Sequence, residues 1–140
     1  MAWLVSERSV EGRALVVDDE EPIRRAVSLL LKTGGYDVAE AANGAQAIEV
    51  LSSGDNPMMM DVIICDIRMP KVNGVEAIAY FGTQYPSIPV IVLTGYPLTD
   101  VSTVVMKDVV VEYLQKPIDQ KSLLAAVARA KAKRRFSFYP

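Results

Sequence analysis

The stretch VIICD at residues 62–66 decides the expected fold. It is a short apolar run, rich in valine and isoleucine, that ends on Asp66 and is followed closely by Pro70. Such a run is typical of a strand buried on both faces, and strands of this kind occur in parallel sheets covered by helices. Ligands of open parallel sheets bind at the carboxyl ends of the strands. Asp66 is therefore a candidate functional residue, and a helix cap or a solvated loop carboxylate is the alternative interpretation.

Apolar strand patterns and helical patterns alternate along the whole chain. Expected strands cover residues 13–17, 36–41, 62–66, 90–93 and 109–114. Expected helices cover residues 21–33, a segment that opens with a capping box from Asn43 to Gln46, residues 75–84, residues 99–107, and a last helix that Asp119 caps and that runs to about 134. This alternation predicts an α/β fold, in which a parallel sheet has helices on both faces and right-handed crossovers.

The side chains within these elements follow the same logic. In the first helix, the apolar stripe predicts that Arg24, Arg25, Ser28 and Lys32 face solvent. Residues 52–57 have the composition of a turn, and the three methionines at 58–60 are expected to fill gaps in the core or its rim.

Composition narrows the function classes. The 140 residues, 51% of them apolar and 23% charged, fit one globular domain. The absence of histidine excludes Ser-His-Asp and Cys-His catalysis and histidine-containing metal sites. The single cysteine, Cys65, lies inside an expected strand and forms no internal disulfide. No segment resembles a signal peptide or a membrane span, so a cytoplasmic location is expected.

The two ends of the chain differ from its middle. Residues 1–12 are expected to be a leader, residues 13–134 the folded domain, and residues 135–140 a tail or the start of a linker. Four basic residues and no acid lie in the last ten residues, which is typical of a solvated helix end and only weakly suggests a nucleic-acid contact. We expect the chain to be either a single-domain protein or part of a longer one, with the second favoured.

Charged and polar residues follow four of the expected strands. They are Asp18, Asp19, Asp66, Thr94 and Lys116. Three carboxylates at one place repel one another unless a cation offsets them, and Mg²⁺ is the hard cation that carboxylate oxygens bind well. Acids for a metal, an ammonium group and a hydroxyl suit phosphoryl transfer, which depends on positioning and charge neutralisation.

Four motifs resemble the signatures of the receiver domain of two-component response regulators. They are LVVDDE at 15–20, DIRMPKVNG at 66–74, LTG at 93–95 and YLQKP at 113–117. The resemblance covers about residues 13–134. It implies a flavodoxin-like, doubly wound (βα)5 three-layer sandwich whose parallel five-stranded sheet has the strand order 2-1-3-4-5.

The resemblance also assigns a role to each site residue. Asp66 would be the phosphoacceptor, and Lys116 would pair with it at rest and with the phosphoryl oxygens afterwards. Asp19 would bind Mg²⁺ directly, Asp18 mainly through water, and Asp66 with the backbone carbonyl of Arg68 would complete the metal site.

Two further residues would act as a switch. Thr94 would move to hydrogen-bond the phosphoryl group, and the rotamer of Tyr113 would follow. Each role has a simpler alternative: Asp18 or Asp19 as a helix cap, Thr94 as an ordinary strand-end hydroxyl, Tyr113 as edge-strand packing, and Lys116 as a surface lysine.

The chain departs from the family pattern at two places. Gly95 replaces the usual alanine after Thr94, and residues 106–112 lack the usual Gly-Ala turn before the last strand. By the same resemblance, Arg68 and Tyr96 would occupy the two variable positions that tune how quickly the phosphoryl group is lost, and their bulk suggests shielding from water.

The expected function is a phosphoacceptor that takes a phosphoryl group from a sensor histidine kinase or a histidine phosphotransfer protein and catalyses only its own phosphotransfer and autodephosphorylation. A homodimer through the expected helix at 99–107, the strand at 109–114 and the last helix is also expected, with no direct nucleic-acid or membrane binding. The alternatives are a phosphatase of the haloacid dehalogenase type, which would need an acid where Arg68 stands, a flavin-binding module, and an inert receiver-like domain.

Overall fold

A computed structural model describes residues 11–67, 74–95 and 110–134 of the chain. The expected leader, the loop that contains Arg68, the helix expected at 99–107 and the tail lie wholly or largely outside these ranges. Within them, five strands form one parallel sheet in the order β2-β1-β3-β4-β5. The strands are β1 (Gly12–Val17), β2 (Tyr36–Ala41), β3 (Val62–Asp66), β4 (Val90–Thr94) and β5 (Val110–Gln115).

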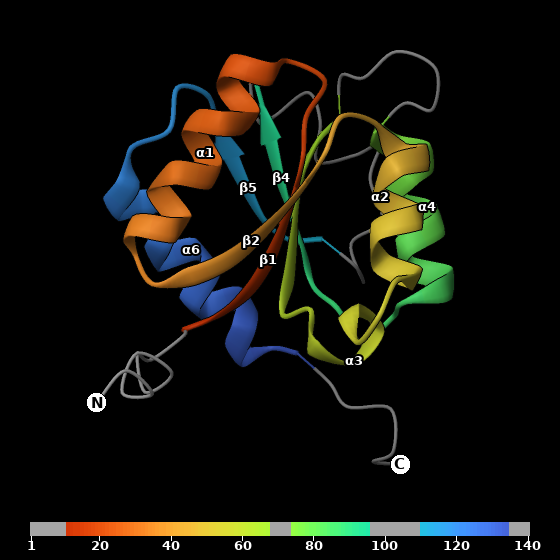
Figure 1. Ribbon diagram of the computed structural model, residues 1–140. Helices are drawn as coiled ribbons and strands as arrows, with labels where there is room; N and C mark the ends of the chain where they lie inside the picture. The colour runs from red at the N-terminus through yellow and green to blue at the C-terminus, as the bar shows by residue number, and fades with distance from the viewer. Residues whose placement is uncertain (1–10, 68–73, 96–109, 135–140) are drawn as a thin grey trace, which may run out of the picture.

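Helices cover both faces of this sheet. They are α1 (Glu21–Thr33), α2 (Gly44–Ser52), α3 (Asn56–Met59), α4 (Gly74–Gln84) and α6 (Gln120–Ala132). Figure 1 shows α1 and α6 on one face and α2 and α4 on the other. The α/β class, the three layers and the strand order 2-1-3-4-5 are thus confirmed. No helix in the three described ranges has both the length and the apolar character needed to cross a membrane.

The strands divide the interior into two hydrophobic clusters, because successive side chains of a strand point to opposite faces. On β1, Leu15 and Val17 join the cluster under α2 and α4, while Ala14 and Val16 join the one under α1 and α6. All five residues of β3 are buried. The central position of β3 is therefore the reason for its continuous apolar sequence.

The outer face of α1 differs from the prediction. Ser28 is buried, at 1% exposure, and the Arg24 side chain is only 12% exposed, although both were expected to face solvent. The expected inward residues Val27 and Leu31 are buried as predicted. Arg24 is covered because its guanidinium reaches the edge strand β2, where it pairs with Glu40. A helical wheel contains no information about that strand.

The segment before β3 also differs in part. The expected turn contains the start of the one-turn helix α3, in which Met58 and Met59 are 73% and 49% exposed, whereas Met60 is fully buried. Only one of the three methionines therefore fills the core.

Arg134 was expected in a solvated helix end, but it is nearly buried beside Asp61, at the edge of the sheet where β3 begins. Its side chain is 5% exposed, pairs with Asp61 at 3.3 Å and donates to the Met58 carbonyl. Asp119 caps α6 as predicted, since its carboxylate accepts from the Ser122 amide at 3.2 Å. Both ends of α6 are thus held by polar contacts.

Asn43→Ala is expected to lower the free energy of unfolding by about 1 kcal/mol, because the Asn43 side chain caps α2. Its Oδ1 accepts from the Gln46 amide at 2.9 Å, and Gln46 Oε1 accepts from the Ala42 amide at 2.8 Å. Urea denaturation measures the change. Asn43→Ser keeps an acceptor and should retain most of the stability, and an equal loss in both variants would contradict the capping role.

Candidate functional site

Polar residues gather where the parallel strands end. β3 ends at Asp66 and β4 ends at Thr94, while Asp18 and Lys116 each follow directly after a strand. In the register of the sheet, Asp66 lies opposite Leu93, and Thr94 lies opposite Gln115. The Lys116 amide donates to the Thr94 carbonyl at 2.7 Å, so the ends of β4 and β5 remain paired beyond the last strand residue. The sheet therefore brings these residues to one edge.

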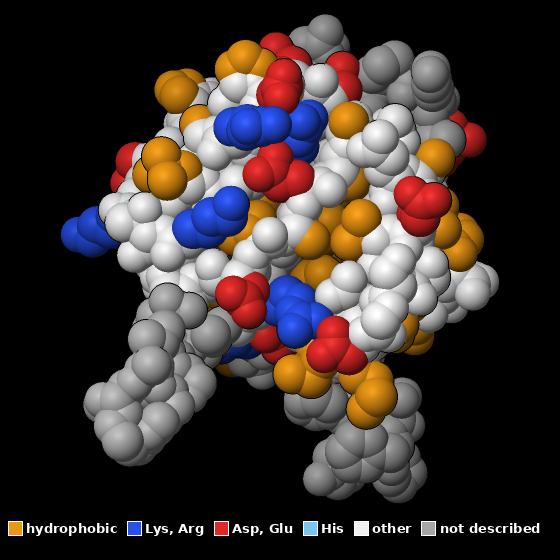
Figure 2. All heavy atoms as spheres, viewed as in Figure 1, with side chains coloured by type: hydrophobic (Ala, Val, Ile, Leu, Met, Phe, Trp, Pro, Cys, Tyr) orange, Lys and Arg blue, Asp and Glu red, His pale blue; other side chains and the backbone are white. Residues whose placement is uncertain are grey.

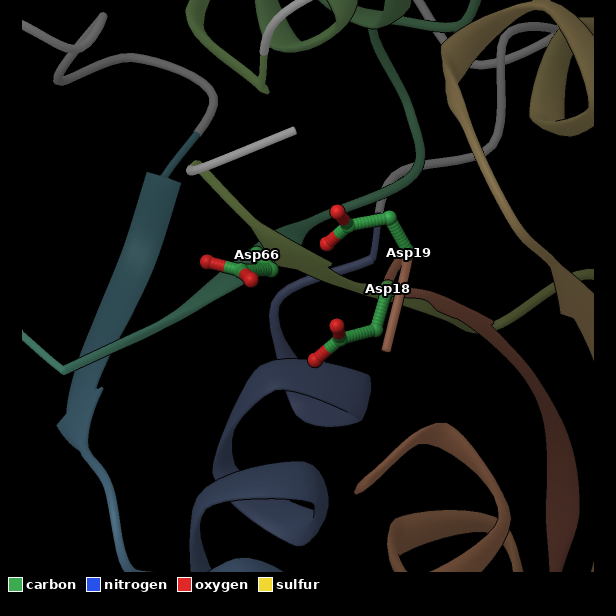
Figure 3. A group of neighbouring side chains, drawn as sticks. All are labelled: Asp18, Asp19 and Asp66. Carbon is green, nitrogen blue, oxygen red and sulfur yellow. The ribbon is translucent and has the colours of Figure 1, made fainter. Parts of the chain in front are cut away.

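Three carboxylates form the centre of the site. One oxygen each of Asp18, Asp19 and Asp66 lies within 4.8 Å of the others, and Figure 3 shows the three side chains as neighbours. Asp18 and Asp66 are 2% and 3% exposed, whereas Asp19 is exposed. Two carboxylates are thus removed from water and the third borders it.

Lys116 offsets the charge of the buried pair. Its Nζ lies 3.1 Å from Asp18 Oδ2, 3.1 Å from Asp66 Oδ2 and 3.8 Å from Glu20 Oε1. Burial lowers the pKa of Lys116, but the hydrogen bond to Asp18 and the charges of Asp66 and Asp18 outweigh it, so the pKa is raised overall. The ammonium group therefore stays protonated across the physiological range.

A pocket of about 320 Å³ opens beside these groups and is lined by Asp19, Glu20, Asp66, Gly95 and Lys116. A Cβ atom added at Gly95 would meet no heavy atom of the described residues within 4 Å. An alanine at this position would therefore also fit without a clash. Carboxylate oxygens this close together are ligands that suit a hard divalent cation. Asp19, which is exposed and lines the pocket, borders solvent. The described residues fit Mg²⁺.

Hydrogen bonds hold the turn that carries the acids. The Asp18 amide donates to the Ala41 carbonyl at 3.1 Å, and Asp18 Oδ1 accepts from the Glu20 amide at 2.9 Å. Pro22 occupies the first turn of α1, where its missing N–H leaves no bond unmade. The turn after β1 is therefore tied both to β2 and to the start of α1.

The other predicted site residues lie as follows. Thr94 is fully buried at the end of β4 and is not among the residues that line the pocket. Tyr113 lies near the end of β5, half-buried against the cluster under α2 and α4, and burial raises its pKa. Arg68 and Tyr96 lie outside the described residues. The sheet edge thus brings Asp18, Asp19, Asp66 and Lys116 together.

Cys65 is enclosed in the same strand. It is fully buried, and burial raises the pKa of its thiol, with the Asp66 and Asp18 carboxylates adding to the effect. The protonated thiol is therefore an unreactive packing group.

Sequence reasoning gave no role to two residues that contact the site. Glu20 lines the pocket, and its side chain makes no capping bond to α1 although it occupies the cap position. Arg24 donates from Nη1 to the Asp18 carbonyl at 2.9 Å. The signal for Glu20 was present, since it is a third consecutive acid after β1, but the contact of Arg24 depends on a neighbouring strand.

A second, apolar pocket adjoins the first and shares Lys116 with it. Its volume is about 420 Å³, and it lies between α1 and the segment after β5. The other lining residues are Pro22, Ile23, Ala26, Val27, Leu30, Leu93, Pro117 and Ile118.

Comparison with known proteins gives consistent similarities. Residues 14–128 match the family model described as the response regulator receiver domain. The chain is 36% identical over 126 residues to the transcriptional regulatory protein ZraR of Klebsiella oxytoca, covering 90% of this chain and 28% of that protein. It is 30% identical over 115 residues to the transcriptional regulatory protein FixJ of Rhizobium meliloti, covering 82% of this chain and 54% of that one.

A solved structure supports the same relationship. The crystal structure of a response regulator receiver domain protein from Clostridium thermocellum aligns with a TM-score of 0.79 at 30% identity, covering 87% of this chain and 95% of that one. The chain thus spans nearly the whole of this solved domain, but less than two thirds of either curated relative.

Proposed function

Because the chain belongs to the receiver-domain family of two-component response regulators, we propose that Asp66 accepts a phosphoryl group from a phosphohistidine on a sensor histidine kinase or a histidine phosphotransfer protein. The observation that carries the proposal is the pairing of the Lys116 ammonium with two buried carboxylates beside a pocket. The nucleophile, a fixed positive charge and space for a phosphoryl group then lie together. Phosphorylation would shift the population of an output surface.

The transfer is an in-line displacement at phosphorus. A carboxylate oxygen of Asp66 forms the new P–O bond while the P–N bond breaks, and the electron pair of the P–N bond stays on the imidazole nitrogen. Lys116 then contacts the phosphoryl oxygens, and the Thr94 hydroxyl donates a hydrogen bond to one of them. Attack by water on the phosphorus later releases inorganic phosphate and restores Asp66, which is the autodephosphorylation step.

Asp19 and Asp66 would hold Mg²⁺ directly, Asp18 mainly through water, and the backbone carbonyl of Arg68 would complete the set. When bound, Mg²⁺ supplies positive charge beside the phosphoryl oxygens. The protein's own contribution is the closeness of the three carboxylates and the ammonium that limits their repulsion. Tyr113 would follow Thr94 as the second switch residue, and Arg68 and Tyr96 would tune the loss of the phosphoryl group.

We further propose that the phosphodonor docks across the apolar pocket between α1 and Ile118, because that pocket shares Lys116 with the acidic one. Residues 13–134 would form the receiver domain, which contains the family match at 14–128. A homodimer through residues 99–107, β5 and α6 remains a separate proposal. Mass measurement with and without beryllofluoride tests it.

Removal of Mg²⁺ is expected to stop the phosphorylation of the protein by acetyl phosphate. With acetyl phosphate and Mg²⁺, the intact protein should gain the mass of one phosphoryl group, and excess EDTA should reduce this gain to background because the repelling carboxylates lose their cation. Mass spectrometry of the whole chain measures the change. Turnover of p-nitrophenyl phosphate by the same sample would instead favour a phosphatase, and equal labelling with and without EDTA would contradict the metal requirement.

A further inference from the structure

We propose that Arg24 is a positioning residue that orients the metal-binding acids by holding the peptide between Asp18 and Asp19. This inference rests on the proposed function, because it concerns how the chain prepares its Mg²⁺ site. Arg24 lies one turn into α1, and its side chain extends back toward the turn that follows β1. Figure 2 shows basic and acidic side chains side by side over α1 and β2.

Arg24 makes two directed contacts from one guanidinium group. Nη1 donates to the Asp18 carbonyl at 2.9 Å, and Nε donates to Glu40 Oε1 at 3.0 Å. The Arg24 side chain is 12% exposed and that of Glu40 is 26% exposed, so water competes little for either bond. Glu40 lies on β2 opposite Val16 of β1. The guanidinium therefore links the edge strand to the acidic turn.

The carbonyl that Arg24 holds belongs to the peptide bond joining two of the predicted metal ligands. A peptide unit is planar and includes the Cα atoms of both residues that it joins. Fixing the direction of the Asp18 carbonyl thus restrains the plane that contains the Cα atoms of both residues, from which their side chains extend. The bond from the Asp18 amide to Ala41 restrains the preceding peptide in the same way.

The geometry requires an arginine rather than a positive charge alone. The planar guanidinium presents several N–H donors in fixed directions, which lets it bond a carboxylate and a carbonyl at once, whereas a lysine ammonium is a compact point charge. Groups that orient metal ligands from outside the coordination sphere typically contribute about 10- to 100-fold in metal affinity. Arg24→Lys keeps the charge and removes this geometry.

The neighbouring Arg25 offers a matched control. Its side chain is 66% exposed, pairs with Glu21 at 3.0 Å and approaches Glu40 at 4.0 Å. Among the contacts of the described residues, none joins Arg25 to the Asp18 carbonyl. Arg25→Met therefore removes the same charge from the same helix and leaves the acidic turn in place.

The test is a titration with Mg²⁺ alone, in which the NMR signals of the Asp19 and Gly95 amides report binding. We expect Arg24→Met and Arg24→Lys to bind Mg²⁺ at least about tenfold more weakly than the wild type. Arg25→Met should bind as the wild type does. Asn43→Ala, which weakens a helix cap elsewhere, should lower stability in urea without changing Mg²⁺ affinity, and it thereby separates positioning from general destabilisation.

Affinities of the Arg24 variants within twofold of the wild type would overturn the inference and leave the proposed function standing. Wild-type affinity in Arg24→Lys alone would show that charge suffices, which also overturns it, and this variant decides the matter if Arg24→Met does not fold. Absence of Mg²⁺ binding by the wild type would refute both the inference and the metal-dependent function.

Discussion

Asp66→Asn is expected to abolish phosphorylation by acetyl phosphate. The amide has nearly the shape of the carboxylate but lacks the anionic oxygen that forms the new bond to phosphorus. Its oxygen can still accept a hydrogen bond from Lys116 Nζ, which lies 3.1 Å from Asp66 Oδ2. We therefore expect a folded protein that gains no phosphoryl mass. Intact-mass spectrometry after incubation with acetyl phosphate and Mg²⁺ measures the result, and circular dichroism checks the fold.

Asp37→Asn is the matched control for this experiment. Asp37 is an exposed aspartate near the start of the edge strand β2, so the change removes the same charge away from the carboxyl ends of the strands. It should be labelled as the wild type is. Labelling of Asp66→Asn at the wild-type level would reject Asp66 as the acceptor, and loss of labelling in both variants would point to an effect of overall charge.

Lys116→Met is expected to slow phosphorylation by about 10²- to 10³-fold, the usual effect of removing one group that stabilises charge in a transition state. The ammonium lies 3.1 Å from carboxylate oxygens of both Asp18 and Asp66 and lines the pocket. Without it, the negative phosphoryl group must approach carboxylates whose charges are no longer offset. The initial rate of labelling by acetyl phosphate, at saturating Mg²⁺, measures the change.

Lys121→Met controls for the loss of one lysine. Lys121 is exposed in the first turn of α6 and does not line the acidic pocket. Its labelling rate should equal that of the wild type. A Lys116→Met rate within threefold of the wild type would limit Lys116 to a structural role.

The elements were predicted well where the signal was local. α1 at Glu21–Thr33 and β2 at Tyr36–Ala41 have the predicted bounds, and β1 and β5 differ by one residue at their ends. Apolar strand patterns, glycines that end helices and capping residues can each be recognised from a few neighbouring positions of the chain. The caps formed by Asn43 and Asp119 were predicted for the same reason, and both are present.

The predictions were less accurate for polar side chains on helices. Arg24 and Ser28 were expected in solvent and are covered, and Arg134 is nearly buried against Asp61. For the two arginines, the bonding group comes from another part of the chain, Glu40 for Arg24 and Asp61 for Arg134. The periodicity of apolar residues in a helix predicts which side faces the sheet, but it does not predict which polar side chains are covered by other segments.

Short segments of the sequence were enough to predict the alternation of strands and helices and the acid, hydroxyl or lysine at four strand ends, because these are local properties. The resemblance of its motifs added the strand order. The packed fold was needed to reveal that Lys116 bonds two buried carboxylates, that Glu20 lines the pocket and that Arg24 reaches the Asp18 carbonyl. Such contacts join residues whose distance depends on how the strands and helices pack, and no local pattern encodes that distance.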